Sequence, residues 1–144
     1  MSFVLPPVIK LAERMLADTE LAVATFPRAH RYSFGNELRT QARAVYRVAL
    51  DAWRYKATRA RALANLVREV DNLKGELQIG QRIRAFRSLG QFEALFLVAR
   101  DLGKQVGGWN RQFHPQGQNS PSTGQAKRSQ ILSTRPTSKR EVNR

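Results

Sequence analysis

Apolar residues recur at steps of three and four through most of the first 112 positions of this 144-residue chain. That spacing places side chains on one face of an α-helix, and the alternation at every second residue that is typical of a half-buried strand is missing. The pattern predicts four helices, at 7–26, 33–55, 59–86 and from the turn at 88–90 to about 112, with short connections at 28–32 and 57–59. Short connections favour antiparallel neighbours. The predicted fold is an all-α, up-and-down four-helix bundle over residues 1–113.

Prolines, glycines and a serine mark the expected helix ends. Pro7 suits a first helical turn, where no intrahelical amide donor is needed, and Pro27 should end the first helix. Ser33 is expected to cap the second helix. Gly80 should interrupt the third helix only weakly, and the glycines at 107–108 should allow close approach or end the fourth helix early.

The helical period also predicts which side chains are buried. Trp53, Phe86 and Phe96 are large enough to exceed what one small bundle can hide, which argues for a homo-oligomer. Trp53 is assigned to the core or to a subunit contact, because aromatic residues at helical spacing are more often core than platforms for unpaired bases. Seven positions of the third and fourth helices are expected inside the bundle: Leu66, Val70, Leu73, Leu95, Ala99, Leu102 and Val106.

From residue 114 the composition changes. Nineteen of the last 31 residues are Gly, Pro, Ser, Thr, Asn or Gln, and a segment so poor in apolar residues cannot bury a core. Residues 114–144 are therefore predicted to be a disordered basic tail. Its basic residues either hold nucleic acid loosely or belong to an extension without a role, and the sequence leaves both interpretations open. These residues are Lys127, Arg128, Arg135, Lys139, Arg140 and Arg144.

Positive charge dominates the whole chain. The formal net charge is +14, and 19 of the 25 basic residues are arginine. Such an excess is costly unless an anionic partner offsets it, so nucleic acid is the first candidate and an anionic membrane surface the second. The alternative is an ordinary solvated helix face. Six arginines are proposed to bind nucleic acid: Arg39, Arg43, Arg47 and Arg54, which fall within roughly an 80° arc of the second helix and are called the arginine row below, with Arg28 and Arg31 in the connection before it.

The chain lacks the residues that several other classes of function require. The chain has no cysteine, which fits a reducing compartment, and its first ten residues do not resemble a signal peptide. The longest apolar runs are too short to span a bilayer. Neither His30 nor His114 stands in a metal-binding spacing, and phosphate-binding loops and nucleophile motifs are missing. We therefore expect a cytoplasmic protein with no catalytic activity, cofactor, metal or membrane partner.

Two short segments resemble one family of small bacterial proteins. Residues 26–35 read Phe-Pro-Arg-Ala-His-Arg-Tyr-Ser-Phe-Gly, and residues 102–109 read Leu-Gly-Lys-Gln-Val-Gly-Gly-Trp. They are similar to the first helix connection and the closing helix of a family of four-helix bundles. That family includes the accessory variability determinant (Avd) of diversity-generating retroelements and proteins encoded within intervening sequences of 23S ribosomal RNA genes. The resemblance covers about residues 5–112; Phe34 replaces the usual leucine, and residues 84–90 lack the family's acidic residue.

The resemblance implies an antiparallel bundle with an accessory role. Avd-like proteins assemble as pentamers, bind the reverse transcriptase of their element and contact its template RNA during mutagenic cDNA synthesis. For this chain the resemblance implies a non-catalytic homo-oligomer, a pentamer, whose partners are a reverse transcriptase and structured template RNA or DNA. The alternatives are a bundle of the ribosomal intervening-sequence type and a helical adaptor for an acidic protein.

Overall fold

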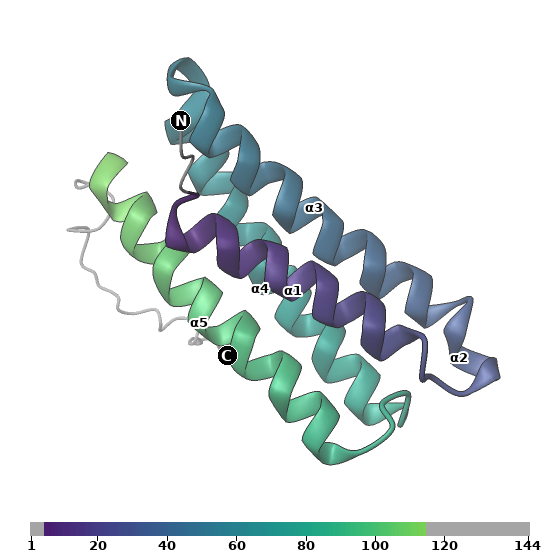
Figure 1. Ribbon diagram of the computed structural model, residues 1–144. Helices are drawn as coiled ribbons and strands as arrows, with labels where there is room; N and C mark the ends of the chain where they lie inside the picture. Colours follow the sequence, from purple (N-terminus) through teal and green to yellow (C-terminus); the bar gives the residue numbers. More distant parts are fainter. Residues whose placement is uncertain (1–4, 115–144) are drawn as a thin grey trace, which may run out of the picture. The chain divides into compact units, whose positions relative to one another are not determined.

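Four long helices make up most of the computed structural model, which describes residues 5–114. They pack antiparallel, with α1 against α3, α3 against α4 and α4 against α5 (Figure 1). The predicted all-α, up-and-down bundle is confirmed, and no strand occurs in this part of the chain. The elements are α1 (Pro7–Val23), α2 (Arg28–Arg31), α3 (Phe34–Arg54), the 3-10 helix η1 (Lys56–Thr58), α4 (Arg59–Arg82) and α5 (Leu89–Phe113).

The first helix ends earlier than its apolar pattern indicates. The prediction placed the end at Phe26, but α1 ends at Val23. The amides of Thr25 and Phe26 then donate to carbonyls three residues back, at 2.9 and 3.0 Å, which tightens the chain into a turn. The turn carries the Phe26 ring into the core, where it is buried. A buried residue therefore continues the apolar period without continuing the helix.

The basic connection after α1 is itself partly helical. Pro27 precedes the single turn of α2, and its carbonyl accepts the amides of His30 and Arg31 at 2.9 and 3.0 Å. Ser33 stands at the expected N-cap position of α3, but its hydroxyl donates to the Ala29 carbonyl at 3.2 Å and does not cap α3. The predicted capping role of Ser33 is wrong because the preceding turn offers its hydroxyl a closer acceptor.

The third predicted helix is also shorter than expected. The apolar period extends to Phe86 and fits either one long helix or a kinked one, whereas α4 ends at Arg82. The Ala85 amide donates to the Gly80 carbonyl at 2.9 Å, and the Arg84 amide to the Gln81 carbonyl at 3.1 Å. This pair of bonds is a Schellman motif, which needs a left-handed residue directly after the helix cap. Arg84 takes that conformation, with φ 59°.

Gly80 marks a close approach between aromatic side chains and α4. A Cβ atom at Gly80 would lie 2.7 Å from ring atoms of both Phe34 and Phe86. The two rings belong to a set of contacts in which Phe26 stacks on Phe34 at 6.0 Å and meets the edge of Phe86 at 5.3 Å, measured between ring centroids. The start of α3 and the α4–α5 loop are therefore packed together through aromatic rings.

The fourth helix begins with a side-chain cap and passes through its glycines. Ser88 Oγ accepts the Gln91 amide at 3.1 Å, while Gln91 Oε1 accepts the Arg87 amide at 2.8 Å, an arrangement similar to a capping box. Gln91 Nε2 also donates to Thr25 Oγ1 at 3.0 Å, which ties α5 to the end of α1. The expected early end at residues 107–108 is wrong, because α5 continues to Phe113.

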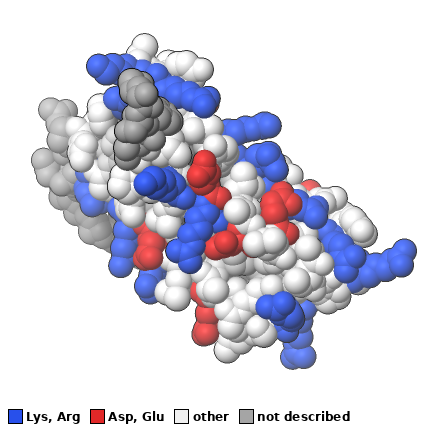
Figure 2. Space-filling view, in the orientation of Figure 1, with Lys and Arg blue, Asp and Glu red and all other residues white. Residues whose placement is uncertain are grey.

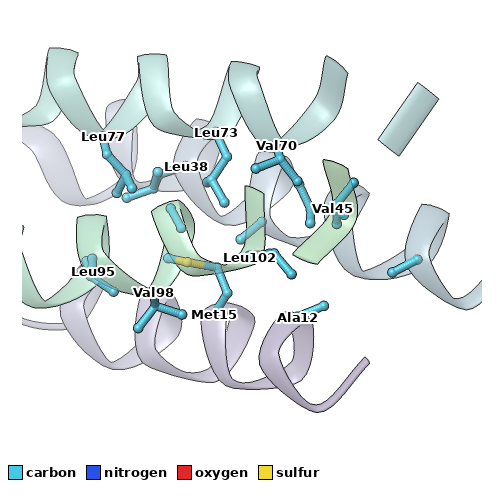
Figure 3. Packing of buried hydrophobic residues seen from close by; sticks show 14 of the residues in the cluster. Ala12, Met15, Leu38, Val45, Val70, Leu73, Leu77, Leu95, Val98 and Leu102 are labelled. Atoms are coloured by element: carbon cyan, nitrogen blue, oxygen red, sulfur yellow. The ribbon is translucent and has the colours of Figure 1, made fainter. Parts of the chain in front are cut away.

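The core lies between the four long helices. All seven side chains predicted to be inside are buried. Figure 3 shows Met15, Leu38, Leu73 and Leu102, one from each long helix, pointing into the shared interior. Of the three large residues expected to exceed the capacity of the bundle, Phe86 is buried among the rings described above, while Trp53 and Phe96 are half-buried against the core. The expectation for Phe86 is therefore wrong.

Thr19 is the buried polar residue of this core. Its side chain is fully buried and its hydroxyl has no hydrogen-bond partner among the described residues. An unsatisfied buried hydroxyl costs about 1–3 kcal/mol. Thr19→Val removes the hydroxyl and keeps the β-branched shape, so we expect it to raise the free energy of unfolding by about 1 kcal/mol in chemical denaturation. The matched change at the exposed Thr40 of α3 should alter stability by less than about 0.5 kcal/mol. A loss of stability in Thr19→Val would contradict the assignment.

The chain divides into two compact units, Met1–Asn110 and Arg111–Arg144. The first contains the bundle. Of the second, the last turn of α5 and His114 are described, and the His114 amide donates to the Arg111 carbonyl at 3.4 Å. The rest of the predicted tail, residues 115–144, lies outside the described residues, so its disorder stays a prediction. No helix in the described part combines the length and apolar character needed to cross a membrane.

Candidate nucleic-acid interface

The arginine row lies on the outer face of α3. The buried side chains of α3, among them Leu38, Val45 and Ala49, occupy the opposite side of this helix. Arg43, Arg47 and Arg54 are exposed and Arg39 is half-buried. Figure 2 shows Lys and Arg spread over one face of the molecule, with Asp and Glu among them near its middle. The row is therefore available to a partner along most of its length.

Glu20 of α1 partly neutralises the first half of the row. Its Oε1 lies 3.0 Å from Arg39 Nε and its Oε2 3.3 Å from Arg43 Nη2. The Glu20 side chain is 38% exposed, so solvent screens both pairs and each stabilises the fold only weakly. Arg39 and Arg43 contribute +2 and Glu20 −1, which leaves +1 there; Arg47 and Arg54 bring the sum for these five side chains to +3.

Arg47 and Arg54 have no ion pair with an acidic side chain in the described part of the chain. The sequence alone placed all four arginines on one face, but the structure divides them between two hollows. One shallow hollow of ≈ 480 Å³ gathers Arg39, Arg43 and Arg47 beside Glu20, Asn36 and Thr40. Arg54 lies at another hollow, which is also lined by Glu13 of α1 and by Tyr46, Leu50 and Trp53.

The two predicted arginines of the connection have different surroundings. Arg28 is exposed. The Arg31 guanidinium donates to the Phe26 carbonyl from Nε and Nη2, at 3.4 and 3.2 Å, and lies 5.9 Å from the centre of the Tyr32 ring. Arg31 therefore helps to hold the turn after α1, in addition to any contact with a ligand.

Three further arginines lie beside this connection and were not predicted as site residues. Arg82, Arg84 and Arg87 follow one another at the end of α4 and in the loop before α5, and all three are exposed. The Phe34–Gly80–Phe86 contact packs this loop against the connection. A signal was present in the sequence, since residues 77–92 contain no Asp or Glu. The contact between this loop and the connection after α1 could not be predicted, because the two segments are about 50 residues apart in the chain.

The aromatic residues beside the row belong mainly to the bundle. Tyr46 and Trp53 are half-buried against the core, which agrees with the assignment of Trp53 to the core. Tyr55 is exposed at a separate hollow that also includes Asp51, Arg61 and Arg68. Among residues 5–114, no group of three or more His, Cys, Asp or Glu residues is arranged to hold a metal ion.

No protein-family model and no curated protein sequence matches this chain. The described residues form an all-helical bundle with an arginine-rich surface.

Proposed function

We propose that this protein is a non-catalytic accessory protein that binds nucleic acid through the outer face of α3. The main observation is that Arg47 and Arg54 are exposed on a packed helix without an acidic partner in the described residues. Guanidinium groups match phosphate oxygens with two parallel donors and keep their charge near neutral pH. A helix held by its buried face fixes the backbone positions of these arginines, so binding has to order their side chains but not the backbone that carries them.

The resemblance to the Avd-containing family makes the proposal more specific. Phe26 is buried, and a Cβ atom at Gly35 would lie 2.7 Å from Val23 Cγ1. Two residues of the similar segment at 26–35 thus have packing roles that a shared bundle would require. On this basis we propose a reverse transcriptase and its structured template RNA or cDNA as partners, in support of mutagenic reverse transcription.

The same proposal includes self-association, with a pentamer as the expected assembly. Trp53 and Phe96 are half-buried, and Leu21 and Leu97 are exposed, so these apolar side chains are available for subunit contacts. The alternatives are the ribosomal intervening-sequence type of bundle and an adaptor for an acidic protein. A reverse transcriptase gene beside the gene for this protein would favour the Avd-like role over both.

The double variant Arg47→Ala/Arg54→Ala tests nucleic-acid binding by the row. Each phosphate contact contributes a slope of about −0.7 to −0.9 to a plot of log affinity against log salt. We expect the double variant to flatten the slope by roughly 1.4–1.8 for RNA and DNA alike, measured by fluorescence anisotropy. Neither side chain is buried, so the thermal midpoint should change little. A folded variant with the wild-type slope would contradict the proposal.

Glu20→Gln tests the same proposal by a change that should increase the affinity for nucleic acid. Removing the carboxylate leaves Arg39 and Arg43 without their acidic neighbour, so binding should tighten several-fold at about 0.1 M salt. Asp101→Asn is the matched control, since it changes the net charge equally at an exposed position near the middle of α5. Equal effects of the two variants would mean that total charge matters and the position of the row does not.

A further inference from the structure

One end of the bundle carries five arginines, and Asp18 of α1 lines the same hollow as one of them, Arg87. Two segments meet there: residues 21–36, with Arg28 and Arg31, and residues 77–92, with Arg82, Arg84 and Arg87. Neither segment contains Asp or Glu. We call these five side chains the arginine pole. Their formal sum of +5, or +4 with Asp18, exceeds the +2 of the arginine row with Glu20 and Glu13. No ion pair with an acidic side chain involves any of the five within the described residues.

The pole is held by packing, although its two segments are distant in sequence. Phe26 and Phe34 come from one segment and Phe86 from the other, and their rings are in contact. Gly80 lets Phe34 and Phe86 approach α4, and the Thr25–Gln91 hydrogen bond joins the segments a second time. The backbones that carry the arginines are thus fixed relative to each other, as a preformed binding surface requires.

The backbone conformation of Arg84 is a second, independent indication that this end of the bundle binds a ligand. Among the described residues Arg84 is the non-glycine residue with a positive φ, at the position of the Schellman motif where glycine is usual. A side chain there costs about 1–2 kcal/mol of backbone strain. Strained positions that persist are often functional. An exposed arginine at such a position indicates a use for its side chain, since the turn itself would be easier to form with glycine.

We infer that the arginine pole binds the phosphate backbone of base-paired nucleic acid; this inference rests on the proposed function. The arginine row begins near the pole along α3, since Asn36 donates to the Tyr32 carbonyl at 3.0 Å and accepts from Arg39 Nη1 at 2.6 Å. The pole and the row are thus neighbouring basic groups at the start of α3, with Glu20 beside the row. Such an arrangement fits a stem, whose phosphates also have fixed positions.

The aromatic residues at the pole favour base-paired nucleic acid over an unpaired strand as the ligand. Proteins that hold unpaired strands stack the bases on open aromatic faces. In the described segments of the pole, the rings of Phe26 and Phe86 are buried. Tyr32 is the largely exposed ring there, at 67%, with the Arg31 guanidinium 5.9 Å from its centre, and a single ring cannot stack successive bases. The available contacts are therefore charge-assisted hydrogen bonds from guanidinium groups to phosphate oxygens.

The double variant Arg84→Gly/Arg87→Ala separates binding from folding. Glycine relieves the strained φ at position 84, so the thermal midpoint should rise by roughly 2–5 °C. Loss of two phosphate contacts should flatten the salt slope by roughly 1.4–1.8 and weaken binding about 25–60-fold at about 0.1 M salt. The probe is a labelled RNA hairpin with a stem of about 20 base pairs, with an unpaired strand of equal length beside it. A variant that is more stable yet binds more weakly cannot owe its defect to unfolding.

Arg61→Ala/Arg68→Ala is the matched control, because it removes two exposed arginines from the opposite half of α4. We expect its effect on the salt slope to be less than half that of the pole variant. An equal effect would overturn the inference, as would loss of affinity for the unpaired strand alone. If the pole variant loses binding to vesicles of anionic lipid but keeps hairpin binding, the pole is a membrane contact and the inference is wrong.

Failure of the inference and failure of the proposed function give different results. Wild-type protein that shows no salt-dependent binding to the hairpin would overturn both. Wild-type binding that weakens in Arg47→Ala/Arg54→Ala but not in Arg84→Gly/Arg87→Ala would overturn the pole and leave the row as the site. Weakening in both double variants, with retained folding, is the result we expect.

Discussion

Replacing Leu102 with alanine is expected to lower the free energy of unfolding by about 3–5 kcal/mol. Leu102 lies near the middle of α5 and is fully buried, and Figure 3 shows it among side chains from the other long helices. Truncation removes buried methyl groups and leaves a cavity, because rigid helices on every side cannot collapse into the space. Domains of this size are stable by only about 5–15 kcal/mol, so a large fraction of the stability should be lost. Urea denaturation followed by circular dichroism measures the change.

Leu97→Ala is the control for this experiment. It makes the same substitution in the same helix, but Leu97 is 47% exposed. The change in helix propensity is identical in the two variants, so the difference between them isolates burial. We expect a loss below about 1 kcal/mol for Leu97→Ala. Similar losses in the two variants would mean that α5 is not packed on the bundle as described.

Gly80→Ala should destabilise the protein although alanine is the better helix former. A Cβ atom at this position would lie 2.7 Å from ring atoms of Phe34 and Phe86, so at least one ring has to move. Overpacking of this kind costs about 1–3 kcal/mol, against a gain of about 0.5–1 kcal/mol in helix propensity. We expect a net loss of about 1–2 kcal/mol in chemical denaturation. The near-ultraviolet circular dichroism spectrum should also change, because the phenylalanine rings move.

Gly75→Ala is the matched control on the same helix. No heavy atom lies within 4 Å of a Cβ built there, so the gain in helix propensity should appear alone, as about 0.5–1 kcal/mol of added stability. The two variants should therefore differ in sign. If Gly80→Ala is as stable as Gly75→Ala, then the rings do not press on α4, and the packing that fixes the arginine pole is not present.

Much of the fold was predictable from local pattern. The helical period fixed the four long helices and all seven predicted core positions, because a residue's place on a helix face depends only on its spacing from its neighbours. The wrong helix ends, at Phe26 and Phe86, share one cause. Both residues are buried and continue the apolar period, but they enter the core from turns. Periodicity reports burial and cannot report whether the backbone is still helical.

The candidate site was only partly predictable. The positions of Arg39, Arg43, Arg47 and Arg54 on one face of α3 followed from sequence spacing. The partial neutralisation of Arg39 and Arg43 did not, because Glu20 comes from another helix and approaches only when α1 packs beside α3. The sequence shows that Glu20 is acidic, but it does not show that Glu20 lies beside Arg39 and Arg43.

The sequence by itself determined the helices, the buried faces and the excess of positive charge, because these depend on residue type and on spacing within one element. Only the tertiary structure decided which charged segments lie close together. The pole exists because the Phe26 ring contacts both Phe34 and Phe86, and because the chain turns left-handed at Arg84 to leave α4. Contacts between residues about 50 positions apart depend on how helices pack, and helix packing is settled by side-chain shape across an interface that no local pattern encodes.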